Sequence, residues 1–483
     1  MGKIAVSVKI LPATDGTRIL PSLRRLISRC LILLCLAALP STSRAWDTGF
    51  WTWHRADPLG DAEREELTAY GAHTLYWHVG EIENRDGEWR WKVPPVIPRP
   101  STKELHVVDV IRLSSFVQDP YNSAAVDALS KKIHAIAPDE VQLDTDCPDR
   151  LLTQFAAALK QIHAQVPHLS VTALEGWCHH PAWEQLQAAV DEIVPMFYDV
   201  QIDPPVPGVA GPLPLVDAAK VRRELAEWSG CKAQWRAGLP LFSRLTVYDQ
   251  TTGLSRGHIR DWSWDDLCFN KSLETVAATT LGVTLLRASE TTTVGNIPVK
   301  KGDHVGVRWP DRDALAAALD TAKNSGAAGV VFFRLPDSTD PSGWSLKQLA
   351  HLDTVPRLIL RKQPASPQLE LVNDAPADLE PRLSGKDAHD RGYAVELEAD
   401  ALVFREAVEG DFWRVTGHAG SGPDSRVVAI PLATRLTFWF SHLRAGQSLS
   451  TGLIQLAPGV DFSQIRYHIV NIPGDSKWQN IQD

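Results

Sequence analysis

Strand-like and helix-like patterns alternate along this chain from Trp46 to about Leu335. Short runs rich in β-branched and aromatic residues predict eight strands, at residues 48–54, 74–81, 106–113, 140–146, 170–175, 193–199, 233–239 and 329–334. Runs with apolar residues three and four positions apart predict helices at residues 61–70, 123–136, 150–165, 181–190, 216–229 and 311–325. This order of elements predicts an α/β fold, a (β/α)8 TIM-like barrel. An open doubly wound sheet is the alternative, although no glycine-rich phosphate loop follows any predicted strand.

Three further segments stand outside the alternation. Residues 83–92, with Asp86-Gly87 at their centre, predict a β-hairpin. Residues 248–307 follow the seventh predicted strand and predict a β-rich insertion over the carboxyl-end mouth of the barrel. Beyond a linker at residues 361–367, short β-patterned runs separated by turn residues predict a β-sandwich-like domain at residues 368–483. The barrel and its insertion would then occupy residues 46–360.

The first 45 residues have the composition of a signal peptide. Arg24, Arg25 and Arg29 precede an apolar run at residues 30–39, and Ser43-Arg44-Ala45 offers a small-residue cleavage site. The apolar run is too short to span a bilayer comfortably, so an uncleaved anchor is the weaker alternative. We therefore expect a periplasmic or secreted protein that has no stable membrane span after cleavage.

Charge and aromatic content narrow the choice of partner. The leader holds seven basic residues and one acidic residue, which leaves 42 Lys and Arg against 57 Asp and Glu in the rest of the chain. So acidic a protein is a poor partner for nucleic acid. All 17 tryptophans follow the leader, and aromatic faces stack on sugar rings. We expect a carbohydrate or polysaccharide partner, although core packing explains many of these rings equally well.

The segment from Glu140 to Pro148 contains two closely spaced carboxylates. Side chains alternate along a strand, so Gln142, Asp144 and Asp146 share one face. Burying three polar groups on one face is costly unless that face lines a site. The two aspartates would titrate as a pair.

Functional residues of a (β/α)8 barrel lie at the carboxyl ends of its strands. That rule selects the catalytic candidates Glu175, Asp146, Asp144, Tyr198 and Asp199, and the substrate-binding candidates Glu81, Arg112, Trp177 and Arg334. Two carboxyl groups flanking a glycosidic bond are the usual means of sugar hydrolysis. Glu175 is the expected acid and Asp146 its partner, with Trp177, Phe197 and Trp183 as an apolar wall that raises the pKa of the acid.

Structural roles remain open for several of these residues. Asp144 and Asp146 could pair with arginine in a purely structural lattice. Glu175 could instead cap the following helix, and Arg334 could pair with a barrel carboxylate without touching a ligand.

Four cysteines follow the leader: Cys147, Cys178, Cys231 and Cys268. Cys147 and Cys178 follow adjacent predicted strands by similar offsets, which makes them disulfide candidates. No cysteine spacing resembles a metal site, and His78, His179 and His180 are more simply explained as solvated loop residues. We expect neither a metal nor a cofactor.

Four segments, VQLDTDCP, SVTALEGWC, VDEIVPMFYD and VVFFRLP, resemble the bacterial family catalogued as domain of unknown function 3142. The resemblance covers most of the chain after the leader. It implies relatedness and no particular chemistry.

The chain also resembles the family-18 glycosidases, the chitinase group, through Asp144-Thr145-Asp146 and Met196-Phe197-Tyr198-Asp199. The resemblance implies that Asp146 orients the acetamido group of the substrate and that Tyr198 and Asp199 assist. The family's catalytic glutamate falls on Pro148, and its first motif aspartate falls on Val141.

Two functions follow from this departure. Asp149 or Glu175 stands in as the acid, or the site binds sugar without cutting it. The first predicts an exported glycoside-hydrolase-like protein that acts on a glycan. The second predicts a non-catalytic carbohydrate-binding or envelope-assembly protein on a degenerate glycosidase barrel. A structural scaffold is the third possibility, if the carboxylates are fully salt-bridged.

Overall fold

The computed structural model describes residues 46–482 except 54, 56–58, 96–99, 101–103, 116–118, 199–212, 280–281, 337–342, 387, 389, 421–424 and 473–476. The expected signal peptide at residues 1–45 and the candidate Asp199 lie outside the described residues. Within the described ranges, every helix is too short or too polar to cross a membrane.

Eight parallel strands close into a barrel, which confirms the predicted fold. They are β1 (Asp47–Thr52), β2 (Thr74–Arg85), β4 (His106–Ser115), β5 (Glu140–Asp144), β6 (His168–Leu174), β7 (Glu192–Met196), β9 (Ala237–Pro240) and β17 (Gly329–Phe333). Each strand pairs with the next in that order, and β17 pairs with β1 to complete the circle. Strand β8 (Gln234–Trp235) adds a short pairing to β7.

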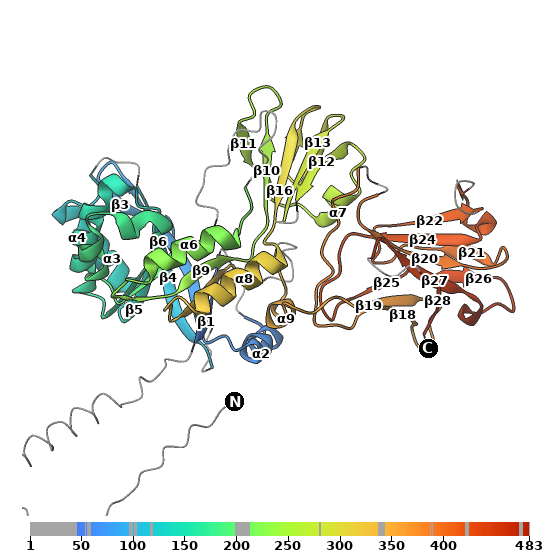
Figure 1. Ribbon diagram of the computed structural model, residues 1–483, viewed down its shortest axis with the longest axis horizontal. Helices are drawn as coiled ribbons and strands as arrows, with labels where there is room; N and C mark the ends of the chain where they lie inside the picture. Colours follow the sequence, from blue (N-terminus) through green and yellow to red (C-terminus); the bar gives the residue numbers. More distant parts are fainter. Residues whose placement is uncertain are drawn as a thin grey trace, which may run out of the picture. The chain divides into compact units, whose positions relative to one another are not determined.

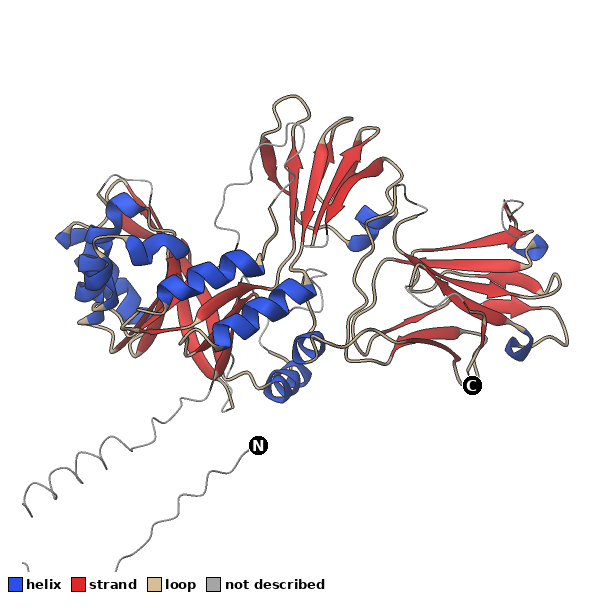
Figure 2. Ribbon diagram, in the orientation of Figure 1, coloured by secondary structure: helices blue, strands red, loops and turns tan. Residues whose placement is uncertain are grey.

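Helices cover the outside of the barrel, as Figures 1 and 2 show. They are α2 (Asp61–Tyr70), α3 (Ser123–Ile136), α4 (Leu152–His163), α5 (Trp183–Gln187), α6 (Ala218–Trp228), α8 (Arg312–Lys323) and α9 (Leu346–Ala350). Side-chain caps set several starts: Asn122 accepts a hydrogen bond from the Ala125 amide at the start of α3, and Asp217 accepts one from the Ala219 amide at the start of α6.

The predicted hairpin replaces a helix between β2 and β4. Strand β3 (Glu88–Val93) runs antiparallel to β2. Asp86 and Gly87 both have positive φ, 56° and 86°, as a two-residue type I′ turn requires. The Asp-Gly pair therefore marks this hairpin correctly.

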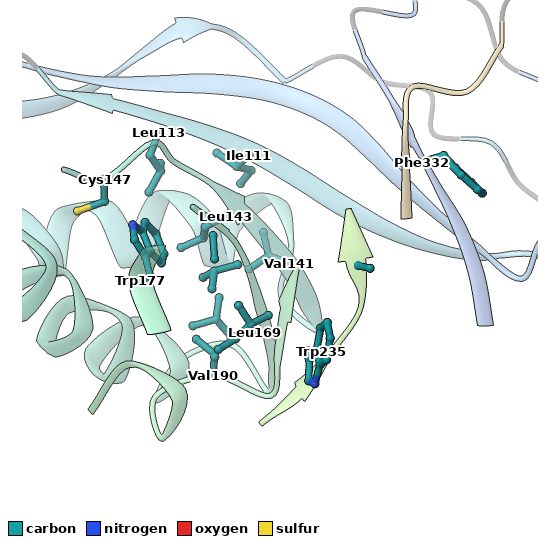
Figure 3. Close-up of a cluster of buried hydrophobic side chains, with 14 of the residues drawn as sticks. Ile111, Leu113, Val141, Leu143, Cys147, Leu169, Trp177, Val190, Trp235 and Phe332 are labelled. Atoms are coloured by element: carbon teal, nitrogen blue, oxygen red, sulfur yellow. The ribbon is translucent and has the colours of Figure 1, made fainter. Parts of the chain in front are cut away.

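Two apolar layers hold the barrel together. The first lies between the strands and the helices, and Figure 3 shows part of it, including Ile111, Leu143 and Trp177. The second fills the barrel interior with Trp51, Tyr76, Val110, Val194 and Val331, among others. The interior is therefore a packed core, and the carboxyl-end mouth is where such a barrel receives a ligand.

The segment between β9 and α8 forms its own antiparallel sheet. The order of its strands is β11 (Ser255–His258), β10 (Arg244–Tyr248), β16 (His304–Arg308), β13 (Val283–Ala288) and β12 (Leu273–Thr279). The pair β14 (Thr292–Val294) and β15 (Ile297–Val299) and helix α7 (Trp264–Cys268) accompany it.

Past α9 the strands of the described residues form three sheets. One contains β18 (Leu358–Lys362), β19 (Leu369–Asn373) and β25 (Ser448–Ser450). The largest contains β23 (Arg426–Val428), β22 (Arg414–Ala419), β24 (Arg435–Phe440), β20 (Tyr393–Glu398), β27 (Arg466–Val470) and β28 (Gln479–Asn480). Strands β21 (Phe404–Ala407) and β26 (Ile454–Leu456) form the third. A shared core, with Leu371 from β19 and Phe438 from β24, gives the expected sandwich-like domain.

Candidate functional site

A pocket of about 220 Å³ opens at the carboxyl ends of the barrel strands. Its lining comes from most of the barrel and from the segment after β9: Trp51, Trp53, Arg112, Asp144, Asp146, Thr172, Met196, Tyr198, Phe242, Arg244 and Phe333. Five of these residues are aromatic, and the polar ones include two carboxylates and two guanidinium groups. The fold thus gathers aromatic and charged side chains at the place where barrels carry their sites.

One arginine holds both carboxylates of the pocket. The Nη1 atom of Arg112 lies 2.9 Å from Asp144 Oδ2, and its Nη2 atom lies 3.1 Å from Asp146 Oδ2. The register explains this contact, since Arg112 of β4 pairs directly with Asp144 of β5. Thr172 of β6 donates a hydrogen bond of 2.9 Å to the other oxygen of Asp144. Three neighbouring strands therefore fix the position of the Asp144 carboxyl.

The two aspartates have different surroundings. The side chain of Asp144 is 9% exposed, whereas that of Asp146 is 56% exposed. Burial raises the pKa of the Asp144 carboxyl, Arg112 opposes this rise, and Asp146 adds to it. Burial works against the charge of Arg112, but Asp144 and Asp146 outweigh it, and the pKa of Arg112 lies above its ordinary value. The pocket therefore has a buried carboxyl at its base and an accessible one beside it.

Aromatic rings form the facing part of the pocket. Tyr198 stacks on Phe333 with ring centroids 5.9 Å apart and an interplanar angle of 16°. Phe242 meets Phe333 edge-on at 5.4 Å. Trp53 lies 5.8 Å from Phe333, and the Arg112 guanidinium lies over its ring at 5.7 Å. An apolar wall exists here, built from residues other than the predicted Trp177, Phe197 and Trp183.

Those three residues are packed inside the protein. Trp177 is 0% exposed, and its ring lies 6.0 Å from that of Phe155 in α4. Figure 3 places it among Leu113, Leu143 and Cys147, beneath the helices. Phe197 and Trp183 both pack against Trp228. The turn after β6 directs the ring of Trp177 into the core, so the structure places this binding candidate outside the pocket lining.

Glu175, the expected acid, is held outside the pocket lining. It begins the 3-10 helix η2 (Glu175–His179), and both of its carboxylate oxygens accept hydrogen bonds from Lys220 of α6, at 2.9 and 2.8 Å. Its backbone oxygen also accepts a bond from the indole of Trp228. Glu175 therefore ties the segment after β6 to α6, and the structure does not bring it together with Asp144 and Asp146.

The remaining binding candidates also lie away from the lining. Glu81 is buried on β2, and Lys92 of β3 donates to its carboxylate at 2.7 Å. Arg334 directly follows β17 and is half-buried. Of the residues selected from the sequence, the pocket brings together Arg112, Asp144, Asp146 and Tyr198.

The pocket also contains residues that the sequence analysis missed, including Trp51, Trp53 and Phe242. Trp51 and Trp53 are two positions apart at the end of β1, so strand alternation alone could have placed both on one face. Phe242 and Arg244 follow the short strand β9, and no periodic pattern marks them.

The predicted disulfide is not formed. Cys147 and Cys178 are both free thiols. Cys147 is buried in the layer between strands and helices (Figure 3), while the Cys178 thiol lies 3.6 Å from the backbone oxygen of Glu175 in η2. Similar offsets after neighbouring strands do not bring the thiols together, because the chain enters a 3-10 turn at Cys178 but not at Cys147.

The fold is a (β/α)8 barrel, and its pocket lining combines aromatic rings with two carboxylates and two guanidinium groups. No protein-family model matches the chain, and no curated protein matches its sequence. Its solved structural neighbours include the spore cortex-lytic enzyme SleL of Bacillus megaterium (14% identity, 60% of this chain and 70% of that one, TM-score 0.41). Another is the chitinase ChiW of a Paenibacillus species (11% identity, 88% of this chain and 54% of that one, TM-score 0.43). A third is a class V chitinase of Pseudomonas fluorescens (14% identity, 60% of this chain and 95% of that one, TM-score 0.39). The barrel assignment rests on this chain's own strand pairing.

Proposed function

We propose that this chain is an exported, glycoside-hydrolase-like protein that binds a saccharide in the pocket at the barrel mouth. The observation that carries the proposal is the pairing of an aromatic wall with the Arg112–Asp144–Asp146 cluster in one pocket. Export is supported by the charged and apolar leader at residues 1–45.

The chemistry of a sugar ring suits both parts of this pocket. One face of the ring presents C–H groups, which pack on aromatic rings such as Tyr198 and Phe333. Its hydroxyl groups need donors and acceptors, which the exposed Asp146 and the charged Arg112 supply. Two guanidinium groups and two carboxylates give the lining a charge near zero, so a neutral glycan fits better than a polyanion.

Hydrolysis is the second candidate, and the raised pKa of the buried Asp144 favours it. In that case the resemblance to family-18 glycosidases assigns orientation of the acetamido group to Asp146 and assistance to Tyr198 and Asp199. Binding ranks first because both carboxylates of the described lining belong to one segment and share one arginine. Most glycosidases need two carboxyl groups on either side of the scissile bond, and in the resemblance to family 18 the position of the catalytic glutamate is Pro148.

Calorimetric titration with oligosaccharides tests the binding proposal. The panel holds tetrasaccharides of N-acetylglucosamine, glucose, xylose and mannose. We expect one of them to bind the purified protein and Trp53→Ala to weaken it about tenfold, a loss of roughly 1.4 kcal/mol. Trp413→Ala is the matched control, because Trp413 is an exposed tryptophan that directly precedes β22 and lies outside the pocket lining. We expect its affinity to be unchanged.

A reducing-end assay on the same sugars separates the two candidates. Binding without turnover supports the first. Turnover that Asp144→Asn and Asp146→Asn each reduce by orders of magnitude supports the second. The absence of binding to any panel member, or equal affinities of Trp53→Ala and the unaltered protein, would reject the proposed site.

A further inference from the structure

A cluster of metal-ligating side chains lies outside the barrel-mouth pocket. The Cys178 thiol, an imidazole nitrogen of His179 and a carboxylate oxygen of Glu227 all lie within 4.8 Å of one another. Cys178 and His179 belong to η2, and Glu227 belongs to the last turn of α6. The cluster therefore joins two elements that are distant in sequence.

The surrounding contacts hold these two elements in place without any metal. The Trp228 indole donates to the backbone oxygen of Glu175 at 2.9 Å, and Lys220 of α6 donates to the carboxylate of Glu175. His179 Nε2 lies 3.0 Å from Glu227 Oε2. The three ligand atoms are thus already close together before binding, so ordering them costs little conformational entropy.

The kinds of donor and their exposure both suit a cation from solution. Cys178 is half-buried, while His179 and Glu227 are exposed. A thiolate, an imidazole and a carboxylate form a mixed soft and borderline set that zinc accepts in tetrahedral geometry. The exposed side of the cluster leaves the fourth position to a water molecule.

We propose that Cys178, His179 and Glu227 bind one Zn²⁺ ion, which clamps η2 to the end of α6. On binding, the Cys178 thiol loses its proton to solvent and the thiolate, imidazole and carboxylate each donate an electron pair to the metal. The site carries no chemistry of the barrel-mouth pocket. It stabilises the segment that follows β6, and it stands whether or not the pocket binds sugar.

Residue spacing along the chain gives no sign of this metal site. Cys178 and His179 are adjacent, and Glu227 follows 48 residues after His179. Only the packing of α6 against η2 brings the third ligand to the other two.

Zinc titration of the purified protein against a chromogenic chelator tests the site. We expect one equivalent of Zn²⁺ to bind and to raise the melting temperature. Cys178→Ser, His179→Ala and Glu227→Gln should each weaken the affinity at least tenfold and abolish the thermal shift. Substitution by Co²⁺ should give the absorption of tetrahedral cobalt with a sulfur-to-metal band that Cys178→Ser removes.

A matched control comes from another exposed histidine–carboxylate pair. His106 Nε2 lies 2.6 Å from Glu140, and its side chain is about as exposed as that of His179. His106→Ala should leave zinc affinity unchanged. Circular dichroism of each variant checks that it is folded. His179 and Glu227 are exposed, so we expect their substitutions to leave the core intact. Substoichiometric binding, unchanged affinity in Cys178→Ser, or a Cys178–Cys231 disulfide in the purified protein would overturn the proposal.

Discussion

At the scale of single residues, Arg112 determines how the two carboxylates at the barrel mouth are held. Strand alternation predicts that Asp144 and Asp146 share a face, and this follows directly from their spacing. Their contact with one shared guanidinium depends on the register that sets Arg112 beside Asp144. The structure therefore shows both aspartates paired with arginine, a possibility that the sequence leaves open. Because Asp146 is exposed, the cluster remains accessible to a ligand.

Removing the guanidinium should destabilise the protein in a pH-dependent way. Arg112→Met leaves the buried Asp144 without its countercharge, so we expect a loss of roughly 2 kcal/mol in the free energy of unfolding at pH 7. Because Arg112 lowers the pKa of Asp144, the variant raises that pKa further. The loss should shrink as the pH falls and Asp144 takes up a proton. Urea unfolding at pH 7 and pH 4 measures it.

The control for this prediction is Arg90→Met, which removes an exposed arginine paired with Glu88 on the hairpin. It should leave stability unchanged at both pH values. If the deficit of Arg112→Met were equal at pH 7 and pH 4, the buried charge of Asp144 would not be its cause.

Glu224, on helix α6, also has a raised pKa. Burial, followed by repulsion from Glu175, raises the pKa of Glu224 to about 7, although Lys220 opposes the rise. An acid whose pKa is raised by folding stabilises the protein at low pH, and this stabilisation is lost as the pH rises through the folded pKa. Glu224→Gln removes the titrating carboxyl and with it this pH-dependent loss of stability. The free energy of unfolding of the variant, relative to that of the unaltered protein, should therefore increase from pH 5 to pH 8.

Urea unfolding at each pH unit from 5 to 8 checks this sign. Glu184→Gln is the control, because a hydrogen bond from Lys232 lowers the pKa of the exposed Glu184. Its stability difference should stay constant over that range. A constant difference for Glu224→Gln as well would place the pKa of Glu224 near its ordinary value.

At the scale of elements, residue periodicity predicts well where the helices and barrel strands lie. It predicts poorly which way side chains point once a strand has ended. The predicted bounds of two helices agree with α2 and α3, and every predicted barrel strand corresponds to an observed one. The residues after β6 enter a 3-10 turn, so the alternation rule no longer applies. For that reason Glu175 faces α6 and Trp177 faces the core.

The burial of Trp177 predicts a phenotype opposite to that of a ligand-binding residue. Trp177→Phe leaves a small cavity and also removes an indole N–H that has no hydrogen-bond partner among the described residues. We expect a loss of roughly 1 kcal/mol in stability and no change in oligosaccharide affinity. Trp53→Phe, in the pocket lining, should show the reverse pattern. Urea unfolding of both variants measures the change in stability, and calorimetric titration measures the change in affinity. Weakened binding in Trp177→Phe alone would contradict a purely structural role for Trp177.

At the scale of the whole molecule, the barrel follows from the sequence because βα alternation leaves few ways to bury both faces of a parallel sheet. The pocket follows only in part. Asp144, Arg112 and Tyr198 converge because strand carboxyl ends meet at one mouth. Phe242 and Arg244 arrive from the segment after β9, whose path depends on tertiary packing rather than on local pattern. The zinc cluster likewise depends on a contact between elements distant in sequence.

A crystal structure of the protein with the tightest-binding tetrasaccharide tests the central claim most directly. We predict density for a sugar ring against Tyr198, Phe333 or Trp53, with a hydroxyl group within hydrogen-bonding distance of Asp146. Density for the sugar only outside the barrel mouth, with the pocket between Arg112 and Phe333 holding water alone, would contradict the account.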